Sequence, residues 1–433
     1  MTTPSSNDLA HLISRRDRAF GAGAPLFYDS PLHIVRGEGV HLFDNEGRRY
    51  VDLYNNVACV GHCHPRVVDA VSRQVSTLNT HSRYIHEGAI AMAERLAALH
   101  GPQIESVLFS CSGTEANEAA LRMAQMVTGR KGIVCTDKTY HGNSDLVSRL
   151  SLVGTVQPES EAVHAFPFPQ KYRPIRPGLS EDELCDAYLE RLEDAIRRFE
   201  QSGVGFAALI LCSIFANEGL PDIPRGFMEK ATLMVHRAGG LVIADEVQAG
   251  YARTGNWWGY EVSGFTPDIV VTGKPMGNGV PLAATATSRA ILEAFRARTR
   301  YFNTFASSPL QAAAGTAVLD VIEDEGLREN VASVGAMLKQ ALIDRRGASA
   351  HIGDVRGTGL FLGVEIVKYG PDHEPDAELA FTLSNKLKNL GFLTSNAGAL
   401  DNMIKIRPPL VFSHADAEEF LDAWDRAVAQ LHG

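Results

Sequence analysis

Two short apolar runs that each end in charged side chains constrain this chain most. Residues 240–246 read Gly-Leu-Val-Ile-Ala-Asp-Glu, and residues 268–275 read Asp-Ile-Val-Val-Thr-Gly-Lys-Pro. Runs this short, rich in Val and Ile and bounded by Gly and Pro, predict buried strands. Because ligands of open α/β sheets bind at the carboxyl ends of strands, we expect Asp245 and Lys274 to face one crevice.

The pairing of a buried acid with a buried lysine has two interpretations. The two side chains could form an ordinary buried ion pair. They could also form a cofactor site, because pyridoxal phosphate needs a lysine for its Schiff base and an acid beside its ring nitrogen. The second interpretation requires two further features elsewhere in the chain, a phosphate-binding turn and an aromatic side chain that stacks on the ring.

The order of the predicted elements indicates the fold class. Between about residues 106 and 290, strand-like and helical segments alternate, which predicts an α/β fold with a mostly parallel central sheet. Short strands before residue 60 and after residue 350 predict smaller α+β segments at both ends. We therefore expect residues 1–60 and 326–433 to form a small domain and residues 61–325 to form a large one. Residues 150–180 read as irregular, and residues 309–346 as one long helical region.

Composition excludes several classes of function. The formal net charge of the 433-residue chain is −10, which argues against a general nucleic-acid surface. The longest apolar run, near residues 206–212, is too short to span a bilayer. No two of the six cysteines have Cys-x-x-Cys spacing, and residues 1–20 lack the apolar core of a signal peptide. We expect a cytoplasmic protein with reduced thiols and no membrane or nucleic-acid partner.

His62, Cys63 and His64 suggest a metal site at first sight. Neighbouring residues on a strand point to opposite faces, and no second pair of ligands follows at metal spacing. A turn before the helix that starts near Pro65 is the better interpretation. We therefore predict no metal site.

Two segments supply the features that pyridoxal phosphate requires. A strand at residues 106–111 runs into Ser112, Gly113 and Thr114 and then into a helix, and the N-terminus of such a helix attracts phosphate. A second strand, at residues 132–137, leads into Tyr140, which could stack on the ring. Each signal is weak alone, because Ser and Thr are also ordinary helix caps.

A nucleotide-hydrolysing motif is the rival interpretation of Asp245 and Glu246. Such a motif needs a loop with two glycines separated by four residues, followed by Lys and Ser or Thr. The nearby Gly273-Lys274 has Asp268 where the first glycine should be and is followed by Pro275. The motif therefore fails at both ends.

The features taken together resemble a known family. The ordered set is Ser112-Gly113-Thr114-Glu115-Ala116-Asn117, Tyr140-His141-Gly142, Asp245-Glu246-Val247-Gln248, Lys274 and Thr304-Phe305. It resembles the class III, fold-type I pyridoxal-phosphate enzymes, the family of the ω-aminotransferases, over about residues 25–430. The resemblance implies a large domain with a mostly parallel sheet and a small domain built from both chain ends.

The resemblance also implies residue roles. Lys274 would carry the cofactor as a Schiff base and later transfer protons, and Asp245 would pair with the ring nitrogen. The other expected cofactor-binding residues are Tyr140 on the ring, Gln248 at the ring hydroxyl, and Ser112, Gly113, Thr114 and His141 around the cofactor. Thr304 would reach the phosphate of a neighbouring subunit, so we expect a homodimer or tetramer with shared active sites.

The chain departs from the aminotransferase pattern at two positions. Many relatives have Glu-Pro where this chain has Cys212-Ser213, and Glu218 is nearby but displaced. The arginine that grips a substrate carboxylate is replaced by Lys405. A lysine is a compact point charge that suits a tetrahedral phosphate at least as well as a carboxylate. The alternative is that Lys405 is neutral drift and a carboxylate still binds.

A narrower resemblance favours phosphate. Residues 55–57, 61–65, 78–86, 273–279 and 301–304 look like the phospho-lyase branch, which contains ethanolamine-phosphate phospho-lyase, although Cys212 and residues 306–308 depart from it. The expected reaction converts phosphoethanolamine to acetaldehyde, ammonia and phosphate. The candidate substrate-binding residues are Lys405, Arg83, Tyr54, Asn55 and Arg407.

Two other functions remain open at this point. One is an ω-aminotransferase that passes an amino group from a primary amine to a keto acid, and the other is a catalytically silent homologue. The ring-binding residues cannot separate lyase from aminotransferase, because both activities use them in the same way. The sequence also leaves open the exact amine and the choice between dimer and tetramer.

Overall fold

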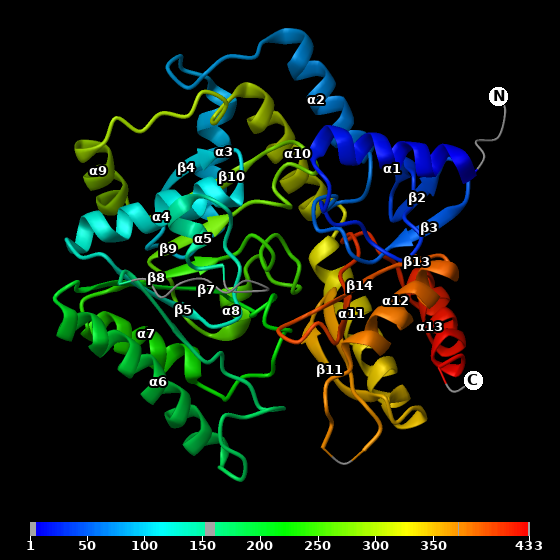
Figure 1. Ribbon diagram of the computed structural model, residues 1–433. Helices are drawn as coiled ribbons and strands as arrows, with labels where there is room; N and C mark the ends of the chain where they lie inside the picture. Colours follow the sequence, from blue (N-terminus) through cyan, green and yellow to red (C-terminus); the bar gives the residue numbers. More distant parts are fainter. Residues whose placement is uncertain (1–5, 152–160, 371, 432–433) are drawn as a thin grey trace.

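The computed structural model describes residues 6–151, 161–370 and 372–431. Figure 1 shows a large α/β body built from the middle of the chain and a smaller body in which the first and last segments lie together. The large body surrounds one seven-stranded sheet, and the smaller body contains two four-stranded sheets. This arrangement confirms the predicted α/β class and the union of the two chain ends.

The central sheet has strand order β4-β10-β9-β8-β7-β5-β6. Only β10 runs antiparallel to its neighbours, so the predicted mostly parallel sheet is confirmed. The strands are β4 Ser106–Ser110, β5 Gly132–Thr136, β6 Val163–Phe166, β7 Phe206–Cys212, β8 Leu241–Asp245, β9 Ile269–Thr272 and β10 Ala283–Thr287.

Helices cover both faces of this sheet, which explains its continuous apolar strands. Successive residues of β8 enter different cores, since Val242 packs in one cluster and Ile243 in another. Helix α4 (Gly113–Thr128) lies on one face, while α6 (Glu181–Ser202) and α7 (Phe227–Arg237) lie on the other (Figure 1). Parallel strands with this cover place their carboxyl ends at one edge, where the cavities described below open.

The smaller body joins segments far apart in sequence. One sheet contains β1 Ile34–Glu38, β2 His41–Asp44, β3 Arg49–Asp52 and β13 Phe392–Leu393, and β13 pairs parallel with β3. The other contains β11 Ile352–Thr358, β12 Phe361–Ile366, β14 Ser395–Ala397 and β15 Met403–Ile406. The domain boundaries at residues 60 and 325 remain predictions.

The remaining helices pack around these sheets. They are α1 Ser6–Phe20, α2 Pro65–Thr77, α3 Glu87–Ala98, α5 Asp145–Ser148, α8 Gly259–Ser263, α9 Arg289–Arg298, α10 Pro309–Asp324, α11 Leu327–Arg345, the 3-10 turn Arg346–Ala348, α12 Ala377–Asn389 and α13 His414–Ala429. No helix of the described residues is long and apolar enough to cross a membrane.

Several elements differ from the sequence-based expectation. The long helical region at 309–346 is divided at Gly326, whose φ of 60° is left-handed and ends the helical path. Strand β6 lies inside the segment predicted as irregular, of which residues 152–160 are outside the described chain. Strand β10 and helix α1 were not predicted. The Ala-rich sequence of β10 has low strand propensity, and its burial in the sheet decides its conformation.

Candidate active site

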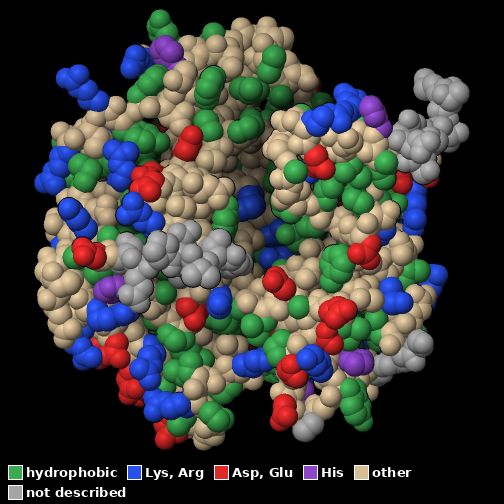
Figure 2. Space-filling model, viewed as in Figure 1, with side chains coloured by type: hydrophobic (Ala, Val, Ile, Leu, Met, Phe, Trp, Pro, Cys, Tyr) green, Lys and Arg blue, Asp and Glu red, His purple; other side chains and the backbone are tan. Residues whose placement is uncertain are grey.

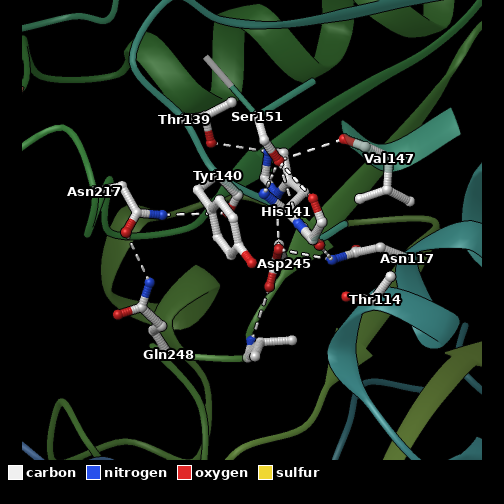
Figure 3. Close-up of polar contacts among 12 residues, drawn as sticks. Thr114, Asn117, Thr139, Tyr140, His141, Val147, Ser151, Asn217, Asp245 and Gln248 are labelled. Carbon is white, nitrogen blue, oxygen red and sulfur yellow. Dashed lines mark hydrogen bonds and ion pairs between the residues drawn. The ribbon is translucent and has the colours of Figure 1, made fainter. Parts of the chain in front are cut away.

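A buried carboxylate lies at the end of β8. Asp245 accepts hydrogen bonds from His141 Nδ1 at 2.6 Å and from Asn117 Nδ2 at 2.9 Å (Figure 3). Burial alone would raise the pKa of Asp245, but the hydrogen bond and attraction of His141 outweigh it, so this pKa lies below its ordinary value. Asp245 is therefore held as an anion.

His141 supports this carboxylate from behind. Its Nε2 lies 2.9 Å from Thr139 Oγ1, and its side chain is buried. Ser151 Oγ accepts hydrogen bonds from the amides of His141 and Gly142 and donates one to the carbonyl of Gly142 (Figure 3). These bonds fix the loop that carries the His141 imidazole. His141, predicted as a cofactor-binding residue, makes its short polar contact with Asp245.

The N-terminus of α4 forms a cradle beside this acid. The first turn of a helix leaves N–H groups without intrahelical acceptors, and here they include those of Gly113 and Thr114, after the cap Ser112. A Cβ at Gly113 would lie 3.0 Å from Val247, and one at Gly142 would lie 2.5 Å from Thr114 Oγ1. A side chain at Gly142 would therefore clash with Thr114, and one at Gly113 would press on Val247.

Lys274 follows β9 and lines the same 290 Å³ cavity as Asp245, Ser112, Gly113, Thr114, Tyr140, His141 and Gln248. Strands β8 and β9 are neighbours, so both side chains emerge at one sheet edge. The Lys274 side chain is exposed toward the cavity, while the surrounding walls desolvate it. This desolvation and the charge of Arg407 lower the pKa of Lys274. Asp245 raises it, but the net result is a pKa below the ordinary value of lysine.

Asn217 is a site residue that the sequence interpretation missed. Its Nδ2 donates to the Tyr140 carbonyl at 3.2 Å, and its Oδ1 accepts from Gln248 Nε2 at 3.1 Å (Figure 3). Asn217 therefore links the backbone of Tyr140 to the side chain of Gln248, and all three residues line the cavity. The sequence signal that could have identified Asn217 is its position five residues beyond the end of β7, at the sheet edge where ligands bind.

A second cavity of 580 Å³ continues from the first. Tyr140, Asn217, Gln248 and Lys274 line both cavities. Lys405 and Arg407 of the β15 end line the second one, together with Tyr54 and Asn55. Figure 2 shows Lys or Arg atoms deep in the hollow between the two bodies.

Lys405 in β15 and Arg407 directly after that strand differ in their contacts. Arg407 donates to Gln248 Oε1 at 2.5 Å and twice to the Tyr54 carbonyl. The Lys405 ammonium lies 5.7 Å from the Phe361 ring centroid, and no carboxylate or hydrogen-bond acceptor of the described chain contacts it. Burial and the charge of Arg407 lower the pKa of Lys405 to about 7. Burial likewise lowers the pKa of Arg407 to about 10.

Two predicted site residues, Thr304 and Arg83, do not line either cavity of this chain. Thr304 is exposed and lines neither cavity, and the Arg83 guanidinium lies 4.1 Å above the exposed Phe302 ring.

The displaced Glu218 faces Thr136, whose hydroxyl donates to it at 2.5 Å, and burial raises the pKa of Glu218 to about 7. His62, part of the rejected metal motif, bonds Asp52 at 2.8 Å.

This donor set fits pyridoxal phosphate. A helix N-terminus with two close-packed glycines suits a phosphate, a carboxylate held as an anion suits a protonated ring nitrogen, and a lysine with a lowered pKa suits a Schiff base. Tyr140 lines the same cavity as these groups. The arrangement therefore favours a cofactor site over a simple ion pair as the interpretation of Asp245 and Lys274.

Comparison with known proteins agrees with this geometry. The family model of class III aminotransferases matches residues 27–428. The chain is 38% identical to the alanine–glyoxylate aminotransferase 2-like protein of Drosophila melanogaster, over 94% of this chain and 85% of that protein. It is 33% identical to ethanolamine-phosphate phospho-lyase homolog 1 of Caenorhabditis elegans, over 97% and 94%.

A solved structure is also similar over nearly its whole length. It is a phospholyase from Arthrobacter in complex with phosphoethanolamine, with a TM-score of 0.93 and 37% identity, covering 96% of this chain and 99% of that one. The chain belongs to the class III aminotransferase family of fold-type I enzymes. Its cofactor is pyridoxal 5′-phosphate, on which members of this family depend.

Proposed function

We propose that this enzyme is a phospho-lyase that releases phosphate from a small phospho-amine, with phosphoethanolamine as the first candidate. The observation that carries the proposal is the buried Lys405 ammonium, which forms no ion pair or hydrogen bond within the described chain. A buried unpaired charge is costly, so its position beside the reacting lysine is best explained by an anionic substrate group. The names of the Caenorhabditis relative and the Arthrobacter structure support the same choice.

The charge balance of the second cavity favours phosphate over carboxylate. Lys274, Lys405 and Arg407 all line it, whereas its one described carboxylate, Asp52, already accepts hydrogen bonds from His62, Tyr54 and Asn55. A phosphate monoester carries a charge of about −1.5 to −2 at neutral pH. It therefore compensates this excess of cations better than a carboxylate does.

The side chains divide the reaction between them. When bound, pyridoxal phosphate supplies an electron sink for charge that develops on the amine-bearing carbon. Lys274 Nζ takes the proton from that carbon, as its lowered pKa allows. Lys405 binds the phosphate group and stabilises it as the bond to the neighbouring carbon breaks. Water then converts the released enamine to an aldehyde and ammonia, which balances the reaction.

The cofactor contacts are part of the same proposal. Asp245 would pair with the ring nitrogen, Tyr140 would stack on the ring, and the amides of Gly113 and Thr114 would hold the cofactor phosphate. Gln248 has one side-chain N–H left for the ring hydroxyl, because its oxygen accepts from Arg407 and its other N–H is directed to Asn217. Tyr54 and Asn55 would supply polar contacts to the substrate.

We also propose a homodimer or tetramer in the cytoplasm. Thr304 is exposed on its own chain, and the family resemblance assigns it to the cofactor phosphate of a neighbouring subunit. Arg83, which lies beside Phe302 on the same surface, would then approach the neighbour's cavity rather than its own.

An aminotransferase is the second candidate function. It is favoured by the name of the Drosophila relative, which is the more identical of the two curated proteins. In that case Arg407 or Lys405 would bind the carboxylate of a keto acid. The cofactor site serves both reactions, so only the products separate them.

The deciding experiment supplies phosphoethanolamine to the cofactor-loaded protein without any keto acid. We expect phosphate, acetaldehyde and ammonia in equal amounts over many turnovers. Conversion of the cofactor to its amine form in a single turnover, with turnover restored by a keto acid and no phosphate released, would instead establish the aminotransferase.

A further inference from the structure

One wall of the second cavity is apolar. Six of its lining residues are Leu26, Phe27, Pro31, Leu32, Ile34 and Leu42, contributed by the segment before β1 and by β1 and β2. Phe27 is 52% exposed and Leu26 46% exposed, although both are large apolar side chains. Among the described residues, the wall therefore faces open space in the cavity.

The wall is anchored to the rest of the protein. Tyr28 Oη donates to the Thr394 carbonyl at 2.8 Å, and the Asp29 amide donates to Asn385 Oδ1 at 3.0 Å. The Phe27 ring packs edge-on against Tyr54, with their centroids 5.0 Å apart. These contacts tie the segment to the C-terminal part of the small body and hold its side chains at the cavity.

Charge defines what this wall can accept. The cations of the cavity are Lys274, Lys405 and Arg407, and its one described acid, Asp52, is engaged by His62. No described acid of the cavity is free for a second amine. An uncharged extension beside the phosphate is the chemistry that matches an apolar wall next to cations.

Size points the same way. A volume of 580 Å³ falls within the range of about 300–1,000 Å³ typical of sites for drug-sized ligands. Phosphoethanolamine has two carbons and would leave the apolar wall in contact with water. A longer substrate would gain the free energy of removing that apolar surface from water.

We propose that the preferred substrate is a vicinal phospho-amine with an uncharged apolar substituent on its phosphate-bearing carbon, which packs against Phe27, Leu32 and Ile34. This inference rests on the proposed phospho-lyase activity. The elimination is unchanged: a proton leaves the amine-bearing carbon, phosphate leaves its neighbour, and water yields ammonia and a longer aldehyde. The class of reaction that must supply such a substrate is phosphorylation of an amino alcohol.

The first test measures binding without turnover. Methyl, ethyl, butyl and hexyl phosphate are titrated calorimetrically into the cofactor-loaded protein. A buried methylene contributes about 0.8 kcal/mol, so we expect Kd to fall about fourfold per methylene until the wall is covered. A Kd that does not depend on chain length overturns the inference.

Two variants locate the effect. Phe27→Ala removes half-exposed wall surface and should reduce the gain per methylene. The control is Val35→Ala, because Val35 follows Ile34 on β1, is 58% exposed and does not line the cavity. It should keep the full gain. An undiminished gain in folded Phe27→Ala contradicts the assignment to this wall.

A turnover series separates this inference from the proposed function. Phosphate release is measured with phosphoethanolamine and with phosphate esters of 1-amino-2-alkanols of increasing length. A rise in kcat/KM with length supports both proposals. Turnover of phosphoethanolamine alone overturns the wall inference and leaves the lyase intact. If no ester releases phosphate while alkyl phosphates still bind more tightly with length, the phospho-lyase proposal is wrong. The inference that this wall binds apolar groups is then retained.

Discussion

Arg407 and Gln248 are joined side chain to side chain, with Arg407 Nη1 donating to Gln248 Oε1 at 2.5 Å. This bond connects the end of β15 in the small body to the loop after β8 in the large body. Gln248 in turn donates to Asn217. A cation that lines the second cavity is thereby tied to two residues that line the first, while the neighbouring Lys405 ammonium makes no hydrogen bond within the part of the chain that the structure describes.

This difference predicts that Arg407 acts mainly through positioning. Arg407→Lys loses the geometry that bonds Gln248 and the Tyr54 carbonyl together. Hydrogen bonds to charged groups are worth about 1.5–3 kcal/mol, so we expect kcat to fall about tenfold to a hundredfold with a smaller change in KM. Steady-state phosphate release checks this split, and a pure KM effect would contradict it.

Lys405 should show the opposite behaviour. Lys405→Met removes the free ammonium but keeps most of the buried volume, so KM for phosphoethanolamine should rise about tenfold to a hundredfold. Lys405→Arg is the matched control, because it retains the charge and should recover part of the affinity. Single-turnover reaction with amines that lack phosphate should be nearly unaffected by Lys405→Met. A KM for phosphoethanolamine that stays unchanged would remove Lys405 from the substrate site.

The pKa of Lys405 sets a pH dependence. This pKa is lowered to about 7 by burial and by Arg407, so the ammonium is charged below pH 7 and neutral above it. Inhibition by inorganic phosphate should therefore weaken as the pH rises through about 7, approaching a tenfold loss per pH unit. The effect should disappear in Lys405→Met. Inhibition that strengthens above pH 7 would contradict the assignment.

His141 should control the acid side of the pH profile. Burial raises the pKa of Asp245 and His141 lowers it, so His141→Gln should move the acid limb of kcat/KM to higher pH. Thr139→Val removes only the contact on the far side of the imidazole and should cause a smaller shift. The pH–rate profiles of the two variants measure the difference, and equal profiles would show that His141 has only a structural role.

Gly142 provides a test of the cradle. Its φ of 138° and a Cβ position 2.5 Å from Thr114 Oγ1 make Gly142→Ala both strained and crowded. We expect a loss of at least about 1 kcal/mol in the free energy of unfolding and weaker retention of pyridoxal phosphate. Gly129→Ala is the control, since Gly129 also has a positive φ but nothing within 4 Å. Chemical denaturation and dialysis measure the two effects.

Much of the large sheet could be predicted from sequence, because its strands are continuous apolar runs between turn residues. Strand β8 and its terminal Asp245 are the clearest example. Strand β10, with the sequence Ala-Ala-Thr-Ala-Thr, was missed because alanine has no strand preference and only its position between β4 and β9 decides its conformation.

The site was predictable only where residue types follow strand ends. Lys274 and Tyr140 stand at such positions and line one cavity. Asn217 was missed, because its role depends on two partners distant in sequence, Tyr140 and Gln248. The different contacts of Lys405 and Arg407 also could not be predicted, since strand alternation places both on one face and says nothing about their partners.

The pairing of β13 with β3 has a consequence for synthesis on the ribosome. Strand β3 ends at Asp52, but its parallel partner begins at Phe392, so one edge of β3 stays unpaired until nearly the whole chain has been made. At about 5–20 residues per second, that delay is roughly 20 s to a minute. Lys405 and Arg407 emerge later still. A chain that stalls before residue 392 therefore lacks Lys405 and Arg407, two of the three cations that line the substrate cavity, and synthesis of the last hundred residues is the step that supplies them.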